Sequence, residues 1–156
     1  MTETNRPEAR QPSRSSLTML LPHVTPTLPD AVEVMTALIE LPPGDPGTPA
    51  HRHSGPVFGY MVEGEMIFEL EGEPERIIRA GEAFWEPGGD VIHYQAGNNL
   101  PDAWSRFVVV MTGAAGTSML TPVDEAELAA RRHLRVGGAG AEDRRGTGKR
   151  RTTPRT

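Results

Sequence analysis

Glycine and proline divide the central part of this chain into short apolar segments, and their spacing limits the folds available to it. The 156 residues include 17 glycines and 15 prolines, about a fifth of the chain. Turn clusters rich in these residues, such as 42–44 and 87–89, follow apolar segments of four to eleven residues. A helical bundle does not tolerate breaks at such intervals, whereas strands of about five residues need them.

The apolar segments between these turns are expected to be strands. Their alternation and spacing predict an all-β fold, a small antiparallel β-barrel or sandwich. The seven expected strands are 31–41, 57–62, 66–70, 76–79, 83–86, 91–95 and 104–112.

One helix is expected after the strands. Thr121 is suited to cap it, Pro122 fits its first position, and Asp124 completes a capping box. Acidic residues follow the expected start, basic residues precede Gly137, and Gly137 is expected to end the helix. We interpret this helix as structural.

The chain is expected to form one domain at residues 17–136, between two disordered tails at 1–16 and 137–156. The second tail is basic, but residues 17–136 contain 17 acidic and 7 basic side chains. An acidic surface repels phosphate backbones, so nucleic acid is not expected to be a partner.

The composition also bears on compartment and chemistry. The absence of cysteine excludes disulfides, thiolate metal ligands and cysteine nucleophiles. The first residues do not have the pattern of a secretory signal, and no run approaches the roughly 18 apolar residues of a membrane span. We therefore expect a cytoplasmic protein without a membrane partner.

Three of the five histidines form a candidate metal site. His51 and His53 are two residues apart, so both project from the same face of a strand. His93 follows the turn at 87–90, and in an alternating strand Gln95 shares its face. If the two strands are neighbours, the imidazoles can reach one divalent cation; a solvated strand face is the alternative for such a pair.

The surrounding residues resemble the two motifs of the cupin family. The first segment reads PPGDPGTPAHRHSGPVFGYMVEGE, from Pro42 to Glu65, and the second reads GEAFWEPGGDVIHYQAGN, from Gly81 to Asn98. The resemblance covers about residues 31–112. It implies a double-stranded β-helix, or jelly roll, in which His51, His53 and His93 bind a metal ion.

This chain departs from the family pattern at the fourth ligand. The glutamate of the first motif falls on Val57 or Phe58, neither of which can bind a metal. Three neutral imidazoles would leave a divalent ion with its full charge and, if octahedral, about three open positions. Such a centre favours an anionic chelating substrate. The alternative is a barrel that kept its histidines but no longer binds metal tightly.

Several other residues are weaker candidates for the site. Gln95 could contact a substrate or a metal-bound water; the alternative is an amide buried in the core. Glu86 could act as a base or replace the missing ligand, although a solvated glutamate is the simpler interpretation. The larger aromatic residues are interpreted as core packing: Tyr60, Phe68, Trp85 and Trp104. His23 is assigned to an N-terminal arm and His133 to the helix end.

The N-terminal arm, residues 17–29, is apolar and rich in proline. This composition suits a segment that lies along a barrel edge or on a second subunit, so a homodimer is expected.

The resemblance implies an enzyme that acts on a small organic molecule. We favour a dioxygenase-type oxidoreductase with a three-histidine Fe(II) centre, with Zn, Mn, Ni or Co as alternative ions. A metal-dependent isomerase or polyketide-type cyclase and a non-enzymatic binding protein are the alternatives. No general base is assigned from the sequence.

Overall fold

The structure is a computed structural model, and it describes residues 17–137. The tails expected at 1–16 and 137–156 lie outside the described residues, apart from Gly137. Within residues 17–137, no helix is long and apolar enough to cross a membrane.

The described chain folds into nine strands followed by a short helix, which confirms the expected fold class. The strands are β1 (Val32–Leu41), β2 (His51–His53), β3 (Val57–Glu63), β4 (Glu65–Leu70), β5 (Arg76–Arg79), β6 (Ala83–Glu86), β7 (His93–Gln95), β8 (Ser105–Ala114) and β9 (Leu120–Pro122). The helix is α1 (Glu125–Arg131), continued by a 3-10 turn at Arg132–Leu134.

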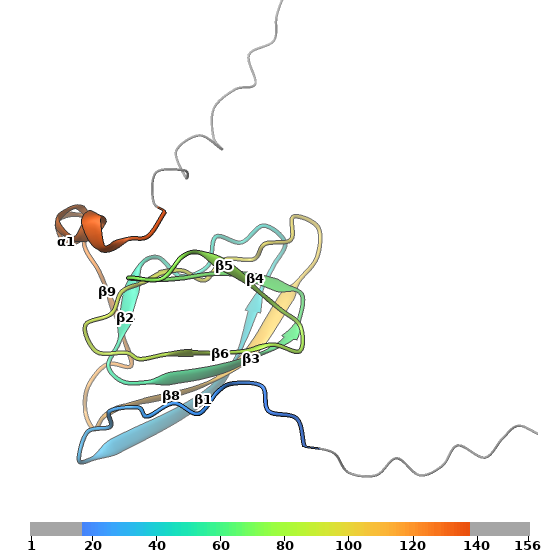
Figure 1. Cartoon of the computed structure of the whole chain (residues 1–156). Coiled ribbons are helices and arrows are strands. Elements are labelled where there is room, and N and C mark those ends of the chain that lie inside the picture. The colour runs from blue at the N-terminus through green and yellow to red at the C-terminus, as the bar shows by residue number, and fades with distance from the viewer. Residues whose placement is uncertain (1–16, 138–156) are drawn as a thin grey trace, which may run out of the picture.

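The strands form two sheets that face each other as two layers (Figure 1). One sheet has the order β1-β8-β3-β6, and the other has the order β5-β4-β7-β2-β9. The pairs within both sheets are antiparallel. Neighbours in each sheet are often distant in sequence, which is the pattern of a double-stranded β-helix.

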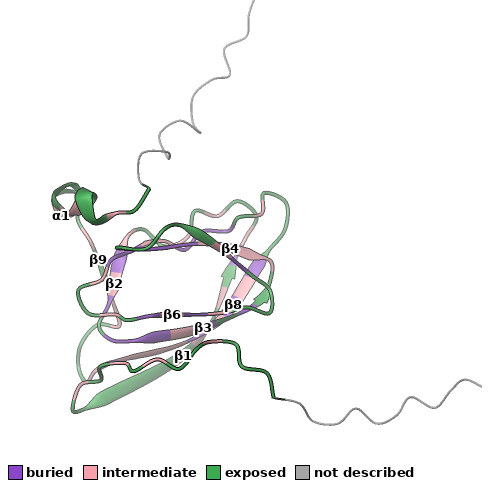
Figure 2. Cartoon of the chain, viewed as in Figure 1, coloured by how far each residue is buried: buried purple, intermediate pink, exposed green. Residues whose placement is uncertain are grey.

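The core lies between the two sheets, where alternating side chains of each strand point inward. Buried positions occur along the inner strands, whereas β1 at the edge is largely exposed (Figure 2). Both sheets contribute to the core, which includes Val57, Met61, Met66, Phe68, Leu70, Ile78, Phe84, Phe107 and Val109.

The expected helix start is wrong by three residues. Thr121 and Pro122 belong to β9, because the segment Leu120–Pro122 pairs with β2. The cap is Asp124, whose Oδ1 accepts a hydrogen bond from the Glu127 N–H at 2.8 Å. The helix ends at Arg131, before the expected Gly137.

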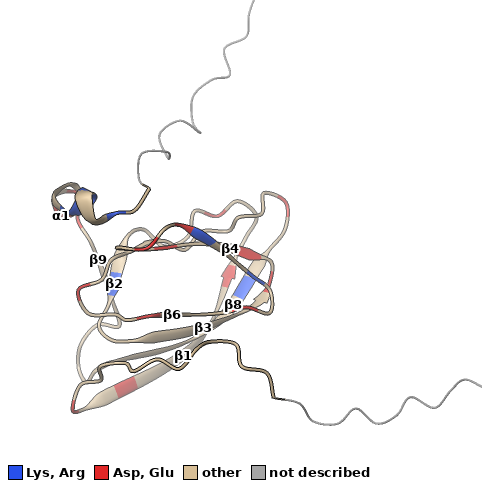
Figure 3. Ribbon diagram, viewed as in Figure 1, with Lys and Arg blue, Asp and Glu red and all other residues tan. Residues whose placement is uncertain are grey.

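Ion pairs attach α1 to the outside of the five-stranded sheet. Charged residues are prominent on α1 and on the neighbouring turns (Figure 3). Arg52 of β2 donates to both carboxylate oxygens of Glu127, and Arg131 bonds Glu71 and Asp90. The helix therefore lies against the strand that carries two of the candidate ligands.

The N-terminal arm, residues 17–29, forms no strand. Most of its side chains are exposed, including Leu17 and Leu28. Met19 and Leu21 line a groove with residues of the β5–β6 segment, including Ile77. The arm thus lies beside the barrel without pairing as an edge strand.

Candidate metal centre

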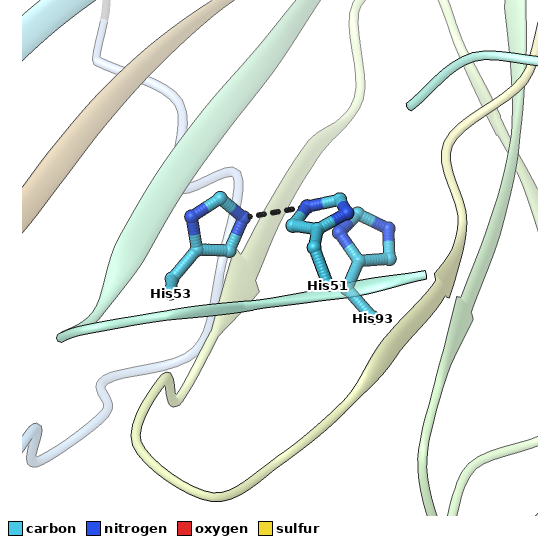
Figure 4. A group of neighbouring side chains, drawn as sticks. All are labelled: His51, His53 and His93. Atoms are coloured by element: carbon cyan, nitrogen blue, oxygen red, sulfur yellow. Dashed lines mark hydrogen bonds between the residues drawn. The ribbon is translucent and has the colours of Figure 1, made fainter. Parts of the chain in front are cut away.

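Strands β2 and β7 bring the three predicted histidines together on the inner side of the sheet. His51 is the register partner of His93, and His53 lies two residues further along the same face of β2. All three side chains are buried. One nitrogen from each ring lies within 4.8 Å of the other two, and the rings cluster in Figure 4. The sequence-based placement of these residues agrees with the structure.

Backbone carbonyls fix which nitrogen of His51 and His53 carries the proton. The Nδ1 of His51 lies 2.7 Å from the Pro49 carbonyl oxygen, and the Nδ1 of His53 lies 3.2 Å from that of Met119. A carbonyl only accepts hydrogen bonds, so both Nδ1 atoms are donors. Each neutral ring then carries its lone pair on Nε2, as in metal-binding histidines held by a backbone oxygen.

Two lone pairs therefore point at each other inside the barrel. The Nε2 atoms of His51 and His53 are 3.1 Å apart (Figure 4). Burial lowers the pKa of His51 from 6.5 to about 4 and also lowers the pKa of His53, so both rings are neutral near pH 7. Without a proton to share, this arrangement is repulsive, and a cation between the two nitrogens removes the repulsion. The donor set fits a metal ion.

His93 supports the same conclusion by a separate observation. Both of its ring nitrogens are buried, and among the described residues neither forms a hydrogen bond; the one polar contact is that of Nδ1 with Glu86. Buried imidazole nitrogens are seldom left unpaired, because desolvation without a partner is costly. A ligand at the centre of the cluster would satisfy one of them.

Glu86 lies in this cluster, and the interpretation of it as a solvated residue is wrong. Its side chain is only 5% exposed, and its Oε2 lies 3.0 Å from His93 Nδ1 and 3.3 Å from His53 Nε2. Burial alone would raise the pKa of Glu86, but the three histidines outweigh it and lower that pKa. The reason for the inward orientation is pairing: β6 lies beside β3, and Glu86 shares its inner face with Phe84.

Gln95 does not face the histidines, so the expectation that it shares their face is wrong. It lines an outer hollow together with Tyr94, Arg132 and Arg135, near α1. The register of β4 and β7 shifts between Glu69 and Leu70, so the usual alternation is interrupted after His93. The next residue that lines the inner cavity is Ala96.

The cavity beside the histidines has a volume of about 100 Å³ and is mostly apolar. Ten of its fifteen lining residues are hydrophobic, including Ile39, Val57, Phe84, Phe107 and Met111. The polar lining residues are Thr48, the three histidines and Glu86, and no lysine or arginine is among them. The cavity is thus an apolar space with one polar end.

The four larger aromatic residues interpreted as core packing differ in how far they are buried. Phe68 is buried and packs 4.9 Å from the His93 ring, as a core residue is expected to. Tyr60 and Trp104 are more than 40% exposed, so the core assignment is wrong for these two. Trp85 is half-buried and stacks on Phe58, and neither lines the cavity.

The other two histidines lie outside the centre. His133 is exposed in the turn after α1, where its Nδ1 lies 3.1 Å from the Ala130 carbonyl oxygen. His23 is an exposed residue of the arm. Both positions match the assignments from the sequence.

Fold and site together define a class: a small antiparallel β-barrel with a buried histidine cluster at the polar end of an apolar cavity. A family model described as a cupin domain matches residues 37–111. The chain belongs to the cupin superfamily.

Comparison with solved structures finds related folds of low identity. The DMSP lyase DddQ from Ruegeria pomeroyi DSS-3 is 22% identical, with 58% of this chain and 43% of that chain covered and a TM-score of 0.49. An oxalate oxidase in complex with glycolate is 21% identical, with 67% and 59% covered and a TM-score of 0.47. An RmlC-like cupin family protein from Methanocaldococcus jannaschii is 24% identical, with 54% and 72% covered and a TM-score of 0.43.

This chain spans less than half of the length of the lyase. A search of curated proteins finds no match.

Proposed function

We propose that this protein is a mononuclear metal-dependent enzyme that oxidises a small organic molecule with molecular oxygen. In this proposal His51, His53 and His93 hold the ion. The observation that carries it is the pair of neutral Nε2 atoms facing each other at 3.1 Å beside the buried ring of His93. Imidazole ligands suit Fe(II), and Zn, Mn, Ni or Co are the alternatives for metal analysis to distinguish.

The protein side chains around the ion have two tasks. A bound Fe(II) would supply the redox chemistry with oxygen and would offer open positions to a chelating substrate. The Nδ1 contacts to Pro49 and Met119 hold two rings in the tautomer that binds a cation. The hydrophobic wall excludes water and orients the apolar part of the substrate.

The residues that line the cavity favour an oxygenase over an isomerase or a cyclase. Both of the latter need a side chain that moves a proton on the substrate. Among the described residues that line the cavity, only the histidines and Glu86 titrate, and all four belong to the cluster itself. An oxygenase whose substrate binds as an anion does not need a separate base.

The walls also indicate the kind of substrate. A cavity of about 100 Å³ is of the same order as the roughly 150 Å³ of an engineered apolar cavity that holds benzene. The absence of lysine and arginine from its described lining leaves no partner for a second negative group. We propose a substrate of about one ring or a short chain, with one chelating group and an apolar remainder.

Oxygen uptake tests this function. The protein is loaded with Fe(II) without oxygen, mixed with pentane-2,4-dione or with catechol, and then exposed to oxygen. We expect uptake that depends on the added compound and is lost in His93→Ala. Product formed without oxygen would instead identify an isomerase or a cyclase, and binding of both compounds without turnover would identify a non-enzymatic binding protein.

We also propose that the protein is a homodimer. Exposed apolar side chains are concentrated on the arm and on the outer face of the β1 sheet, namely Leu17, Met19, Leu20, Leu28, Val34, Leu38, Tyr60 and Val62. A second copy covering this face would bury them. Light scattering at micromolar concentration should give twice the chain mass of 16.9 kDa, and a single species of 16.9 kDa would contradict the dimer.

A further inference from the structure

Glu86 and Val57 are direct partners across two neighbouring strands. The pairing of β3 with β6 places Val57 opposite Glu86, and both are buried on the inner side of the sheet. Residues opposite each other in an antiparallel pair have Cβ atoms about 4.5–5.5 Å apart. A carboxylate at position 86 therefore reaches the same part of the barrel as one at position 57 would. It can take the place of the missing ligand.

The distances around Glu86 match those between ligands of one ion. Metal bonds of about 2.0–2.2 Å place neighbouring ligand atoms about 2.8–3.1 Å apart at right angles, and a little further apart in a tetrahedron. The Glu86 Oε2 lies 3.0 Å from His93 Nδ1 and 3.3 Å from His53 Nε2. The Nε2 atoms of His51 and His53 are 3.1 Å apart. These three separations lie close to that range.

Glu86 approaches His53 on the ligand side of the ring. A carboxylate that only orients a metal-binding histidine bonds the ring nitrogen that faces away from the metal. In His51 and His53 that nitrogen is Nδ1, and backbone carbonyls already occupy it. Glu86 instead lies beside the Nε2 of His53, where the ion would be.

The carboxylate of Glu86 has no lysine or arginine partner among the described residues. Within residues 17–137, the only ion-pair contacts of Glu86 are those to His53 and His93. A carboxylate that is only 5% exposed is costly to bury without a partner, and a metal ion at the cluster would provide one.

We propose that Glu86 is the fourth protein ligand of the metal, supplied by β6 across from the position that Val57 occupies on β3. This inference rests on the proposed metal centre and replaces the expectation of a centre with three protein ligands. The carboxylate lowers the net charge of a divalent centre to +1 and leaves two open positions if it is octahedral. A chelating substrate that binds as a monoanion then forms a neutral complex, which suits the apolar cavity.

Metal affinity and spectroscopy of a Glu86→Gln variant test the assignment. Gln has nearly the same shape, and circular dichroism checks the fold. The control is Glu73→Gln, which removes the same charge from an exposed turn. Co²⁺ binding is measured by chelator competition, and the visible spectrum of the bound ion is recorded.

We expect Glu86→Gln to raise the Co²⁺ dissociation constant at least tenfold and to change the spectrum, with Glu73→Gln unchanged in both. Wild-type affinity and spectrum in Glu86→Gln would overturn the assignment while leaving the metal centre intact. Failure of the wild-type protein to bind Co²⁺ would overturn both proposals.

A crystal structure of the Co²⁺-loaded wild-type protein gives a second readout that depends on no variant. We expect a Glu86 oxygen at about 2.0–2.2 Å from the ion. An ion held by the three histidines with the carboxylate more than about 3 Å away would contradict the proposal.

Discussion

His51 lies directly opposite His93 across the pair formed by β2 and β7, so two segments forty residues apart present their imidazoles to one point. The ring centroids are 5.0 Å apart, and both side chains are buried. The pairing of these two short strands therefore determines whether a metal centre forms.

Replacement of His93 by alanine should abolish metal binding and turnover together. The change removes one of the three clustered imidazoles, so we expect metal affinity to fall by at least about a hundredfold. The measurement is bound metal after dialysis, followed by the oxygen-uptake assay. His133→Ala, in an exposed turn, is the control, and full turnover by His93→Ala would refute the ligand assignment.

Removal of Arg135 should destabilise the fold through Glu69. The guanidinium pairs with both carboxylate oxygens of Glu69 at 2.5 Å, and the Glu69 side chain is only 2% exposed. Arg135→Met leaves a buried carboxylate unpaired, and we expect a loss of about 2–3 kcal/mol, allowing for the partial exposure of Arg135. Urea unfolding measures it. Arg79→Met, at an exposed pair with Glu65, should cost less than about 1 kcal/mol, and equal effects of the two changes would contradict this account.

Asn98 should be important for stability and not for chemistry. Its Nδ2 donates to the carbonyl oxygens of Leu41, Pro42 and Ala103, and its Oδ1 accepts from Leu100 N–H and the Ser105 hydroxyl. Asn98→Ala removes all five of these hydrogen bonds, so we expect a loss of about 2–4 kcal/mol in urea unfolding.

Metal affinity per folded molecule should stay unchanged in Asn98→Ala. Asn99→Ala is the control, because its amide is exposed and contacts only Glu65. A loss of unfolding free energy under about 1 kcal/mol for Asn98→Ala would show that the hydrogen bonds of Asn98 contribute little to stability.

Metal removal should lower the thermal stability of the protein. An ion that binds the native state alone stabilises it by about 2.7 kcal/mol at a free concentration one hundred times its dissociation constant. For a chain of this size we expect a rise of about 5–10 °C on adding the ion to chelator-treated protein. His93→Ala should show no rise, and the same rise in that variant would point to binding elsewhere.

Much of the fold follows from local signals in the sequence. The turns at glycine and proline delimit the strands because those residues interrupt pairing, and the predicted segment 76–79 coincides with β5. The histidine pair of β2 is recognisable because two residues of the same type alternate on a strand. The order of the two motifs predicts the facing histidine of β7.

The remaining features of the site and the fold depend on which strands pair. Residues close together in the sequence do not specify that pairing. Glu86 belongs to the centre because β6 lies beside β3, and alternation with Phe84 is the one sequence signal for its inward orientation. Gln95 leaves the inner face because of a register shift between β4 and β7. The start of α1 moves to Asp124 because Thr121 is paired with β2, a contact about seventy residues distant.

The metal content of the purified protein tests the central claim most directly. Elemental analysis after expression in metal-replete medium should give about one equivalent of a divalent transition metal per chain. Less than about a tenth of an equivalent, together with no thermal stabilisation by added Fe, Mn, Co, Ni or Zn, would contradict the account.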